Sequence, residues 1–292
     1  MEKIILANEL GEVVKSQLVE ETNKIYHSNK IGISKSKLAN MSKSPEYFKW
    51  LLDNPQEPTN DLILGQAFHK ITLEPDTFYE EFAVMPNCDR RTKEGKEIYA
   101  RFMEENSTNG DKTIITEDTY NTICGMRDSV MANKYACALL SNGNTEQSIY
   151  WVDELTNEIC KCRPDYYRTI EDRILITDLK SCRNADSLSL SKDVVKYGYD
   201  LQAGMYSTGL STHFDKPLDL IDFVFIFVEK EPPYLINVTQ ASRFVIDRGI
   251  SLFREYLGMY AECKRTNNWY GYNGETGAPN DLLLPSYMIQ KQ

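Results

Sequence analysis

Apolar residues recur every three or four positions over much of the first half of the chain, a spacing typical of amphipathic helices. Ser44, followed directly by proline, is a typical helix start and predicts a helix over residues 45–52. The same spacing predicts a helix over 61–73 and a longer one over 117–140, which begins at a Thr116 cap. The first half of the chain is therefore expected to be mainly helical.

Beyond Gly143 the pattern changes to short β-prone runs that are separated by turns. Residues 147–155, 159–167 and 173–181 predict a meander of three strands. The nearly continuous apolar run 221–228 predicts a buried central strand, because a strand covered on both faces lacks polar alternation. The remaining expected elements are a helix over 199–210, a strand over 234–238 and a long amphipathic closing helix over 242–264.

These elements predict an α/β fold in which helices flank a mixed central sheet and the N-terminal part is helical. The length of 292 residues suits one large domain or two small ones. We interpret the chain as a single domain with four parts. They are a lead-in segment over 1–32, a mainly helical part over 33–142, a sheet core over 143–240, and a closing helix with an aromatic, glycine-rich tail over 241–292.

The net charge of −10, from 33 basic and 43 acidic residues, argues against a protein that binds nucleic acid over its whole surface. It does not exclude a nuclease, because a locally basic groove and an acidic metal site can occur in one chain. No apolar run approaches the roughly 20 residues that cross a bilayer, and the N-terminus carries too many carboxylates for a secretory signal. We therefore expect a cytoplasmic protein without a membrane partner.

Seven scattered cysteines do not suggest a disulfide framework, since their number is odd and their spacings are irregular. Cys160 and Cys162 are the one close pair, and their spacing differs from the paired C-x2-C pattern of zinc sites. On a strand both side chains would point to one face, so we expect them to pack in the core.

The stretch from Asp165 to Lys180 carries the main candidate chemistry. Side chains alternate along a strand, so Asp178 and Lys180 point to one face while Leu179 points into the core. A hairpin would bring Asp165 beside Asp178, and two carboxylates next to a lysine suit a Mg²⁺ ion. Such an ion activates water for phosphodiester hydrolysis, and the lysine can orient or deprotonate that water. The alternative is a solvated sheet edge, which gives the same pattern.

Four further residues are candidates for the same site. They are His69 on the predicted helix over 61–73, Glu146 before the first strand of the meander, and Gln202 and Tyr206, which share one helix face at i and i+4. Each has a structural interpretation as well. A helical histidine is often a core residue, an acid at a strand start is usually solvated, and a pair at i and i+4 can be ordinary packing.

These residues occur in a recognisable order, and the sequence resembles the PD-(D/E)xK nucleases of the RecB-like group, in particular the RecE (exodeoxyribonuclease VIII) exonuclease family. The resemblance runs from about Ile33 to Tyr272. The matching motifs are Ser44-Pro45, Gly65-Gln-Ala-Phe-His69 with Leu73-Glu-Pro75, Arg90-Arg-Thr92 with Gly95-Lys96, Arg163-Pro-Asp165, Asp178-Leu-Lys180, Gln202-x-x-x-Tyr206 and Phe227-Val-Glu-Lys-Glu-Pro-Pro-Tyr234. The fold that this resemblance implies is the restriction-endonuclease-like core of the superfamily.

The resemblance also implies a role for each matched residue. The implied metal ligands are His69, Asp165, Asp178 and the backbone carbonyl of Leu179. Lys180 is the implied catalytic lysine, and Gln202 and Tyr206 would line the site and contact the scissile strand. Glu146 is expected as an outer carboxylate near the metal. The implied cofactor is Mg²⁺, for which Mn²⁺ substitutes; because no cysteine precedes His69, we expect no iron–sulfur cluster.

RecE-like enzymes degrade linear duplex DNA from 5′ to 3′ and leave 3′ single strands for an annealing protein of the RecT type, in phage-type recombination. They assemble as rings, and the resemblance implies a homo-oligomer here, with a tetramer favoured. The densest basic stretch contains Arg90, Arg91, Lys93 and Lys96, and is a candidate for phosphate contact or a solvated loop. Two alternatives stay open: a Cas4-like or restriction-type nuclease on the same core, and an inert DNA-binding relative.

Overall fold

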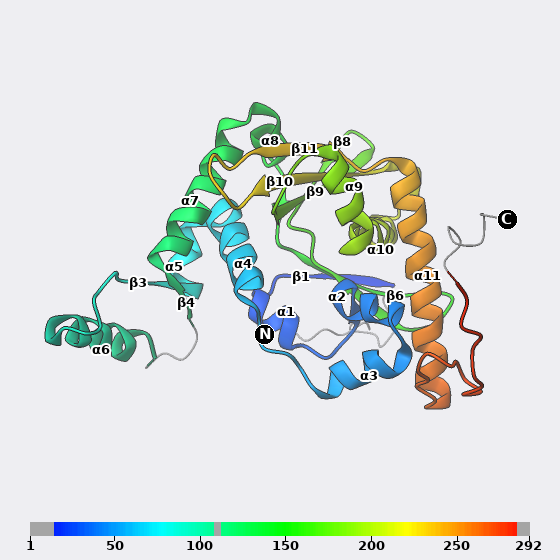
Figure 1. Cartoon of the computed structure of the whole chain (residues 1–292). Helices are drawn as coiled ribbons and strands as arrows, with labels where there is room; N and C mark the ends of the chain where they lie inside the picture. The colour runs from blue at the N-terminus through cyan, green and yellow to red at the C-terminus, as the bar shows by residue number, and fades with distance from the viewer. Residues whose placement is uncertain (1–14, 108–111, 285–292) are drawn as a thin grey trace, which may run out of the picture.

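A five-stranded mixed sheet forms the centre of the molecule and has helices on both faces (Figure 1). The computed structural model describes residues 15–107 and 112–284. In spatial order the strands are β11 (Ile236–Gln240), β10 (Ile221–Glu229), β9 (Arg173–Cys182), β8 (Tyr166–Ile170) and β5 (Asn144–Thr145). β9 and β10 run parallel, and the other neighbours run antiparallel. The predicted α/β fold with a mixed central sheet is confirmed.

The side chains of β10 alternate between two separate parts of the core. Phe223, Phe225 and Phe227 belong to the part that contains residues of α10 and α11, whereas Ile226 and Val228 belong to the part that contains residues of α4 and α7. The bounds of these helices are α4 (Asn60–Leu73), α7 (Glu117–Ala132), α10 (Tyr199–Phe214) and α11 (Arg243–Thr266). Burial on both faces explains why the run lacks polar alternation, as predicted.

A second sheet of four strands lies next to the first. In spatial order its strands are β1 (Ser16–Val19), β6 (Ser148–Val152), β7 (Ile159–Cys162) and β2 (Ile33–Ser34). The pairing of β1 with β6 makes the described part of the lead-in segment an edge of this sheet, and residues 1–14 of that segment lie outside the described residues. Cys160 and Cys162 on β7 are both buried in one core cluster, as predicted.

The expected three-strand meander is divided between the two sheets, which corrects the predicted strand over 159–167. β7 belongs to the four-stranded sheet and β8 to the five-stranded sheet. The hairpin register continues across the division, because Ile149 pairs with Cys162 and Thr145 with Tyr166. Glu146, which has a positive φ of 53°, marks the bend between β5 and β6. The two long arms of the hairpin therefore bend together from one sheet into the other.

Two differences from the predicted helices concern Asn133 in the helical part and the residues after Asp186 in the sheet core. The expected helix over 117–140 is broken at Asn133, whose side chain accepts hydrogen bonds from the backbone N–H groups of Tyr135 and Ala136 and so begins a new helix. A helix after Asp186 was not predicted. The remaining helices are α1 (Asn23–Ser28), α2 (Lys35–Leu38), η1 (Ala39–Ser42), α3 (Pro45–Asp53), η2 (Pro75–Thr77), α5 (Phe78–Glu81), α6 (Lys93–Ser107), α8 (Lys134–Leu139), α9 (Ser187–Lys196) and η3 (Leu218–Leu220).

An arm projects from the body beside α4 and α7 (Figure 1). It consists of α6 and a two-stranded parallel sheet of β3 (Phe82–Met85) and β4 (Thr113–Thr116). Within the described ranges, no helix has the length and apolar character that are needed to cross a membrane.

Candidate active site

Three acidic residues occupy one row across neighbouring strands at the division between the two sheets. The backbone N–H of Glu146 donates to the carbonyl of Asp165 over 3.1 Å, so these two residues face each other across the bent hairpin. Asp165 lies one residue before Tyr166, which pairs with Thr177, and this register places Asp165 opposite Asp178. The predicted approach of Asp165 to Asp178 is confirmed, and Glu146 extends the same row.

His69 reaches this row from α4. Its Nε2 lies 2.8 Å from the backbone carbonyl oxygen of Leu179, and its Nδ1 lies 3.5 Å from Oδ1 of Asp165. The other oxygen of Asp165 accepts a hydrogen bond of 2.7 Å from the backbone N–H of Leu179. The side chain of Leu179 packs in the core beside α4 and α7, as predicted. His69 is therefore attached to the acidic row and is not an isolated core histidine.

The group formed by His69, Glu146 and Asp165 has the composition and the spacing of a metal site. One ligand atom from each residue lies within 4.8 Å of the other two. Mg²⁺ prefers carboxylate oxygens, and adjacent ligands of an octahedral ion are about 3 Å apart, close to the spacing of His69 Nε2 and the Leu179 carbonyl. The residues therefore fit a divalent cation. Glu146, expected as an outer carboxylate, belongs to this compact group.

Arg163 fixes the position of Glu146. Its Nε donates to the backbone carbonyl of Glu146 over 2.8 Å and lies 3.0 Å from a carboxylate oxygen of the same residue. Both side chains are largely buried. A left-handed backbone costs a non-glycine residue about 1–3 kcal/mol, so these contacts offset a strained conformation.

Asp178 and Lys180 point to the α10 side of β9, as strand alternation predicts. Asp178 is fully buried; Gln202 Nε2 on α10 donates to its Oδ1 over 2.5 Å, and the ammonium of Lys180 pairs with its Oδ2. Asp178 is not part of the compact group of His69, Glu146 and Asp165, and it lies beside Asp165 on the strand. Its assignment as a metal ligand stays a prediction.

The electrostatics of the row favour a bound cation. Burial raises the pKa of Glu146 to about 7, and burial together with the charge of Asp165 raises the pKa of Asp178 to about 6. Burial opposes protonation of His69, but the Asp165 carboxylate outweighs this effect and raises the pKa of His69 to about 9. Against the effect of burial, His69 in turn holds the pKa of Asp165 below its usual value. A divalent ion would stabilise the charged forms of the crowded carboxylates.

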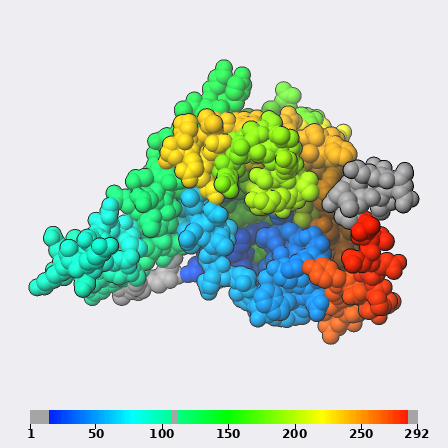
Figure 2. Space-filling view, viewed as in Figure 1, coloured from blue at the N-terminus to red at the C-terminus, as the bar shows by residue number. Residues whose placement is uncertain are grey.

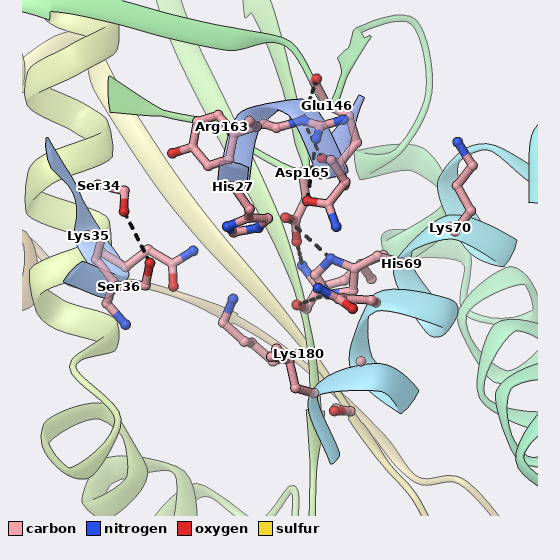
Figure 3. A pocket seen from close by; sticks show the side chains of 18 of the residues that line it. His27, Ser34, Lys35, Ser36, His69, Lys70, Glu146, Arg163, Asp165 and Lys180 are labelled. Atoms are coloured by element: carbon pink, nitrogen blue, oxygen red, sulfur yellow. Dashed lines mark hydrogen bonds and ion pairs between the residues drawn. The ribbon is translucent and has the colours of Figure 1, made fainter. Parts of the chain in front are cut away.

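A cavity of about 420 Å³ opens over this row. It appears as a hollow on the molecular face between α9, α4 and the α2–α3 segment (Figure 2). His69, Glu146 and Asp165 form one wall, Ser34, Lys35 and Ser36 form the opposite wall, and Lys180 extends between them (Figure 3). Gln202 and Tyr206 also line the cavity, and their contact with a scissile strand stays a prediction.

The four basic residues of the predicted DNA contact lie elsewhere. Arg90, Arg91, Lys93 and Lys96 are all exposed at the start of the arm, and none of them lines the cavity. Arg90 stacks over the ring of Tyr99, with 4.8 Å to the ring centroid. Their contact with DNA stays a prediction, and it would occur on the arm.

Lys35 and Tyr199 are two of the cavity residues that were not predicted from the sequence. Burial, with the nearby charge of Lys180, lowers the pKa of Lys35 to about 8, and its Nζ donates to the carbonyl of Tyr197 over 2.9 Å. Tyr199 lies between Lys35 and Lys180, whose ammonium groups are 5.9 and 5.5 Å from its ring centroid. Tyr199 precedes Gln202 by three residues on one helix face, a signal that the sequence contains. Lys35 has no such signal.

Comparison with known proteins agrees with this geometry. Residues 34–278 match the family described as PDDEXK-like domain of unknown function (DUF3799), and the chain belongs to that family. It is therefore a member of the PD-(D/E)xK nuclease superfamily, as the sequence motifs indicate. No curated protein matches the sequence.

Among solved structures, the fold is similar to that of a protein from Eubacterium rectale described as a candidate exonuclease. The TM-score is 0.60 at 13% identity, and the match covers 94% of this chain and 99% of that chain. SSO0001 matches with a TM-score of 0.28 at 13% identity, over 85% of this chain and 95% of that chain. VC1899 from Vibrio cholerae matches with a TM-score of 0.26 at 11% identity, over 85% of this chain and 58% of that chain. The first of these supports the fold, and the other two are too distant to carry an argument.

Proposed function

We propose that this chain is a divalent-metal-dependent deoxyribonuclease that hydrolyses phosphodiester bonds. The proposal rests on the compact group of His69, Glu146 and Asp165, within 4.8 Å of one another, beside the Asp178–Lys180 pair. Membership of the PD-(D/E)xK superfamily supports the same reaction class. The net charge of −10 agrees with a protein that binds DNA at a restricted site only.

Some of these residues would bind a cation, and Lys180 would act on the attacking water and the phosphoryl group. Mg²⁺, or Mn²⁺ in its place, would polarise a phosphoryl oxygen and lower the pKa of a bound water molecule. His69, Glu146 and Asp165 would hold the ion, with Asp178 and the Leu179 carbonyl as further oxygen ligands. The ammonium of Lys180, whose side chain is 16% exposed, would orient the attacking water and neutralise charge that develops on the phosphoryl group. Gln202 orients Asp178 through its 2.5 Å hydrogen bond.

The finer proposal is a 5′→3′ exonuclease that acts on linear duplex DNA and leaves 3′ single strands for recombination. It rests on the resemblance to RecE-like enzymes and includes a RecT-type annealing partner and a ring-shaped homo-oligomer, with a tetramer favoured. At −10 per chain, long-range forces repel DNA, so encirclement would prevent escape between cuts. Light scattering should then give several times 33.6 kDa. A monomer that degrades DNA processively would refute the ring.

The experiment that tests the activity uses linear duplex DNA labelled at either the 5′ or the 3′ end, with Mg²⁺ and with EDTA. The expected result is metal-dependent release of mononucleotides or short products from the 5′ label first, while covalently closed circles stay intact. Efficient cutting of closed circles would indicate a restriction-type or Cas4-like endonuclease instead. Absence of any metal-dependent cleavage would indicate an inert DNA-binding relative.

A further inference from the structure

Two tyrosines, Tyr197 and Tyr199, form a sharp corner beside the cavity, and Tyr199 lines it. α9 ends at Lys196, Gly198 adopts a left-handed conformation with φ of 64°, and α10 begins at Tyr199. Glycine adopts this conformation without a steric cost, so the chain can turn from one helix directly into the next. The turn places Tyr197 beside Tyr199, with 5.7 Å between the ring centroids and 35° between the ring planes.

The inner ring of this corner, Tyr199, packs on the core, while the outer ring, Tyr197, is half exposed. Tyr199 lines the cavity and packs on Phe225 and Phe227, with centroid distances of 5.8 and 5.7 Å. Tyr197 is 49% exposed, although an apolar ring usually gains from burial. Its backbone is held in place, because Lys35 Nζ donates to its carbonyl over 2.9 Å.

Cations surround the two rings. Lys196 Nζ lies 4.8 Å from the ring centroid of Tyr197, and Lys35 and Lys180 lie within 6 Å of the ring of Tyr199. Aromatic rings interleaved with lysines are the means by which proteins bind unpaired nucleic-acid strands, since bases stack on the rings and phosphates pair with the cations. The corner has this composition, and it adjoins the cavity that is lined by His69, Glu146 and Asp165.

The size of the cavity restricts what enters it. A volume of about 420 Å³ is in the range of small-molecule sites. B-form DNA, whose major groove alone is about 12 Å wide, is too large to be enclosed in it. A single strand that leaves the duplex at its end is narrow enough to enter the cavity and reach the acidic row, and the base that it unpairs then needs a new stacking partner.

We propose that Tyr197 is this partner: its exposed ring stacks on the unpaired nucleobase next to the scissile phosphate, so that the site takes a strand end that is splayed from the duplex. This inference rests on the proposed nuclease function. Tyr199 supports the ring from behind, and Lys35 fixes the corner. Tyr197 is thus a substrate-positioning residue that acts on binding more than on the chemical step.

The chain contains a matched control for Tyr197. Tyr135 on α8 is 64% exposed and also follows a lysine, Lys134, whose Nζ lies 4.9 Å from its ring centroid. Neither Tyr135 nor Tyr197 lines the cavity itself, but of the two only Tyr197 lies beside a ring that does, that of Tyr199. Substitution of Tyr135 therefore removes the same kind of surface ring without removing the proposed contact.

The first measurement does not require cleavage. A single-stranded oligonucleotide with 2-aminopurine at its end is titrated with protein in Ca²⁺, which occupies oxygen sites but positions water and phosphate poorly for turnover. Stacking on the ring should quench the fluorescence. We expect Tyr197→Ala to weaken binding by about 5- to 150-fold, the range for one lost base–aromatic stack, and to abolish the quenching. Tyr197→Trp should retain both, and Tyr135→Ala should equal the wild type.

The second measurement compares kinetics in Mg²⁺ on duplexes with a paired end or with a mismatched terminal pair. Tyr197→Ala should raise KM more than it lowers kcat, and the mismatch should recover part of the loss, because unpairing then costs less. Unchanged binding and kinetics in Tyr197→Ala, or an equal loss in Tyr135→Ala, would overturn the inference. A wild-type protein that quenches the probe through Tyr197 but never cleaves would refute the nuclease proposal and retain the stacking site.

Discussion

His69 on α4 lies 2.8 Å from the backbone carbonyl of Leu179 on β9, measured from Nε2 to the oxygen. This contact connects the helical part of the chain to the strand that carries Asp178 and Lys180. The other ring nitrogen faces Asp165 at 3.5 Å. One imidazole therefore lies between two of the groups that would hold a cation, and the first prediction concerns its removal.

His69→Ala should weaken Mn²⁺ binding by about tenfold or more, as loss of a metal ligand or of a residue that orients one does, and should remove most cleavage. Isothermal titration calorimetry with Mn²⁺ and a cleavage assay measure the two effects. His213 is a suitable control, because its Nδ1 lies 3.0 Å from the Ser16 hydroxyl and it does not line the cavity. A lower melting temperature with normal metal affinity and normal specific activity would assign His69 to the core.

Each acid of the row should be required for cleavage. Asp165→Ala and Asp178→Ala should abolish detectable activity, and Glu146→Gln should reduce it by at least about 100-fold, because each change removes an oxygen ligand or its neighbour. The fold should persist in Asp178→Ala and Glu146→Gln, since the raised pKa values of these two carboxyls mean that their charges oppose folding of the metal-free protein. Asp165→Ala also loses the contact with His69 and should lower the melting temperature. Circular dichroism checks the fold. Full activity in any of the three variants would reject its place in the site.

Lys180→Ala should lose turnover by about 10²- to 10⁴-fold while it keeps metal and DNA affinity, because its charge acts mainly on the transition state. Lys180→Arg should not restore turnover, since the planar guanidinium differs in shape from the ammonium. Lys192→Ala, on the exposed surface of α9, is the control. Weaker DNA binding at unchanged kcat in Lys180→Ala would make the lysine a phosphate anchor only.

Metal affinity should rise with pH. His69 keeps its proton up to about pH 9 in the metal-free protein, and a metal ligand must lose that proton. With one proton displaced, affinity should increase about tenfold per pH unit up to about pH 9, and more steeply below about pH 7, where Glu146 is also protonated. The His69–Asp165 contact should stabilise the metal-free fold fully below about pH 6.5 and lose that effect as the pH rises through about 9. Calorimetry at several pH values tests the slope, which His69→Ala should reduce.

The double variant Arg90→Ala with Arg91→Ala should reduce cleavage and leave metal affinity unchanged. The slope of log DNA affinity against log salt concentration should become less steep by about one for each phosphate contact that is lost. The double variant Lys264→Ala with Arg265→Ala removes the same charge from α11 and should act like the wild type. Salt titrations of DNA binding measure both. Equal effects of the two variants would mean that only net charge matters.

Local rules were enough to predict the parts of the site that lie on one element. Alternation along a strand predicted that Asp178 and Lys180 share a face and that Leu179 packs in the core, and both are confirmed. Helical spacing placed Gln202 and Tyr206 together on the cavity. Pro164 between β7 and β8 is a local sign of a break in the run 159–167, but the division between two sheets depends on the distant partners of each strand.

The sequence by itself determined which groups carry the chemistry, since side-chain type and spacing along a strand or helix are local properties. Only the tertiary structure decided how they meet. Glu146 joins His69 and Asp165 because the hairpin bends at a left-handed residue that Arg163 supports. The tyrosine corner reaches the same cavity because Lys35, more than 160 residues earlier, binds the carbonyl of Tyr197. Such contacts depend on the packing of whole elements, which no short stretch of residues specifies.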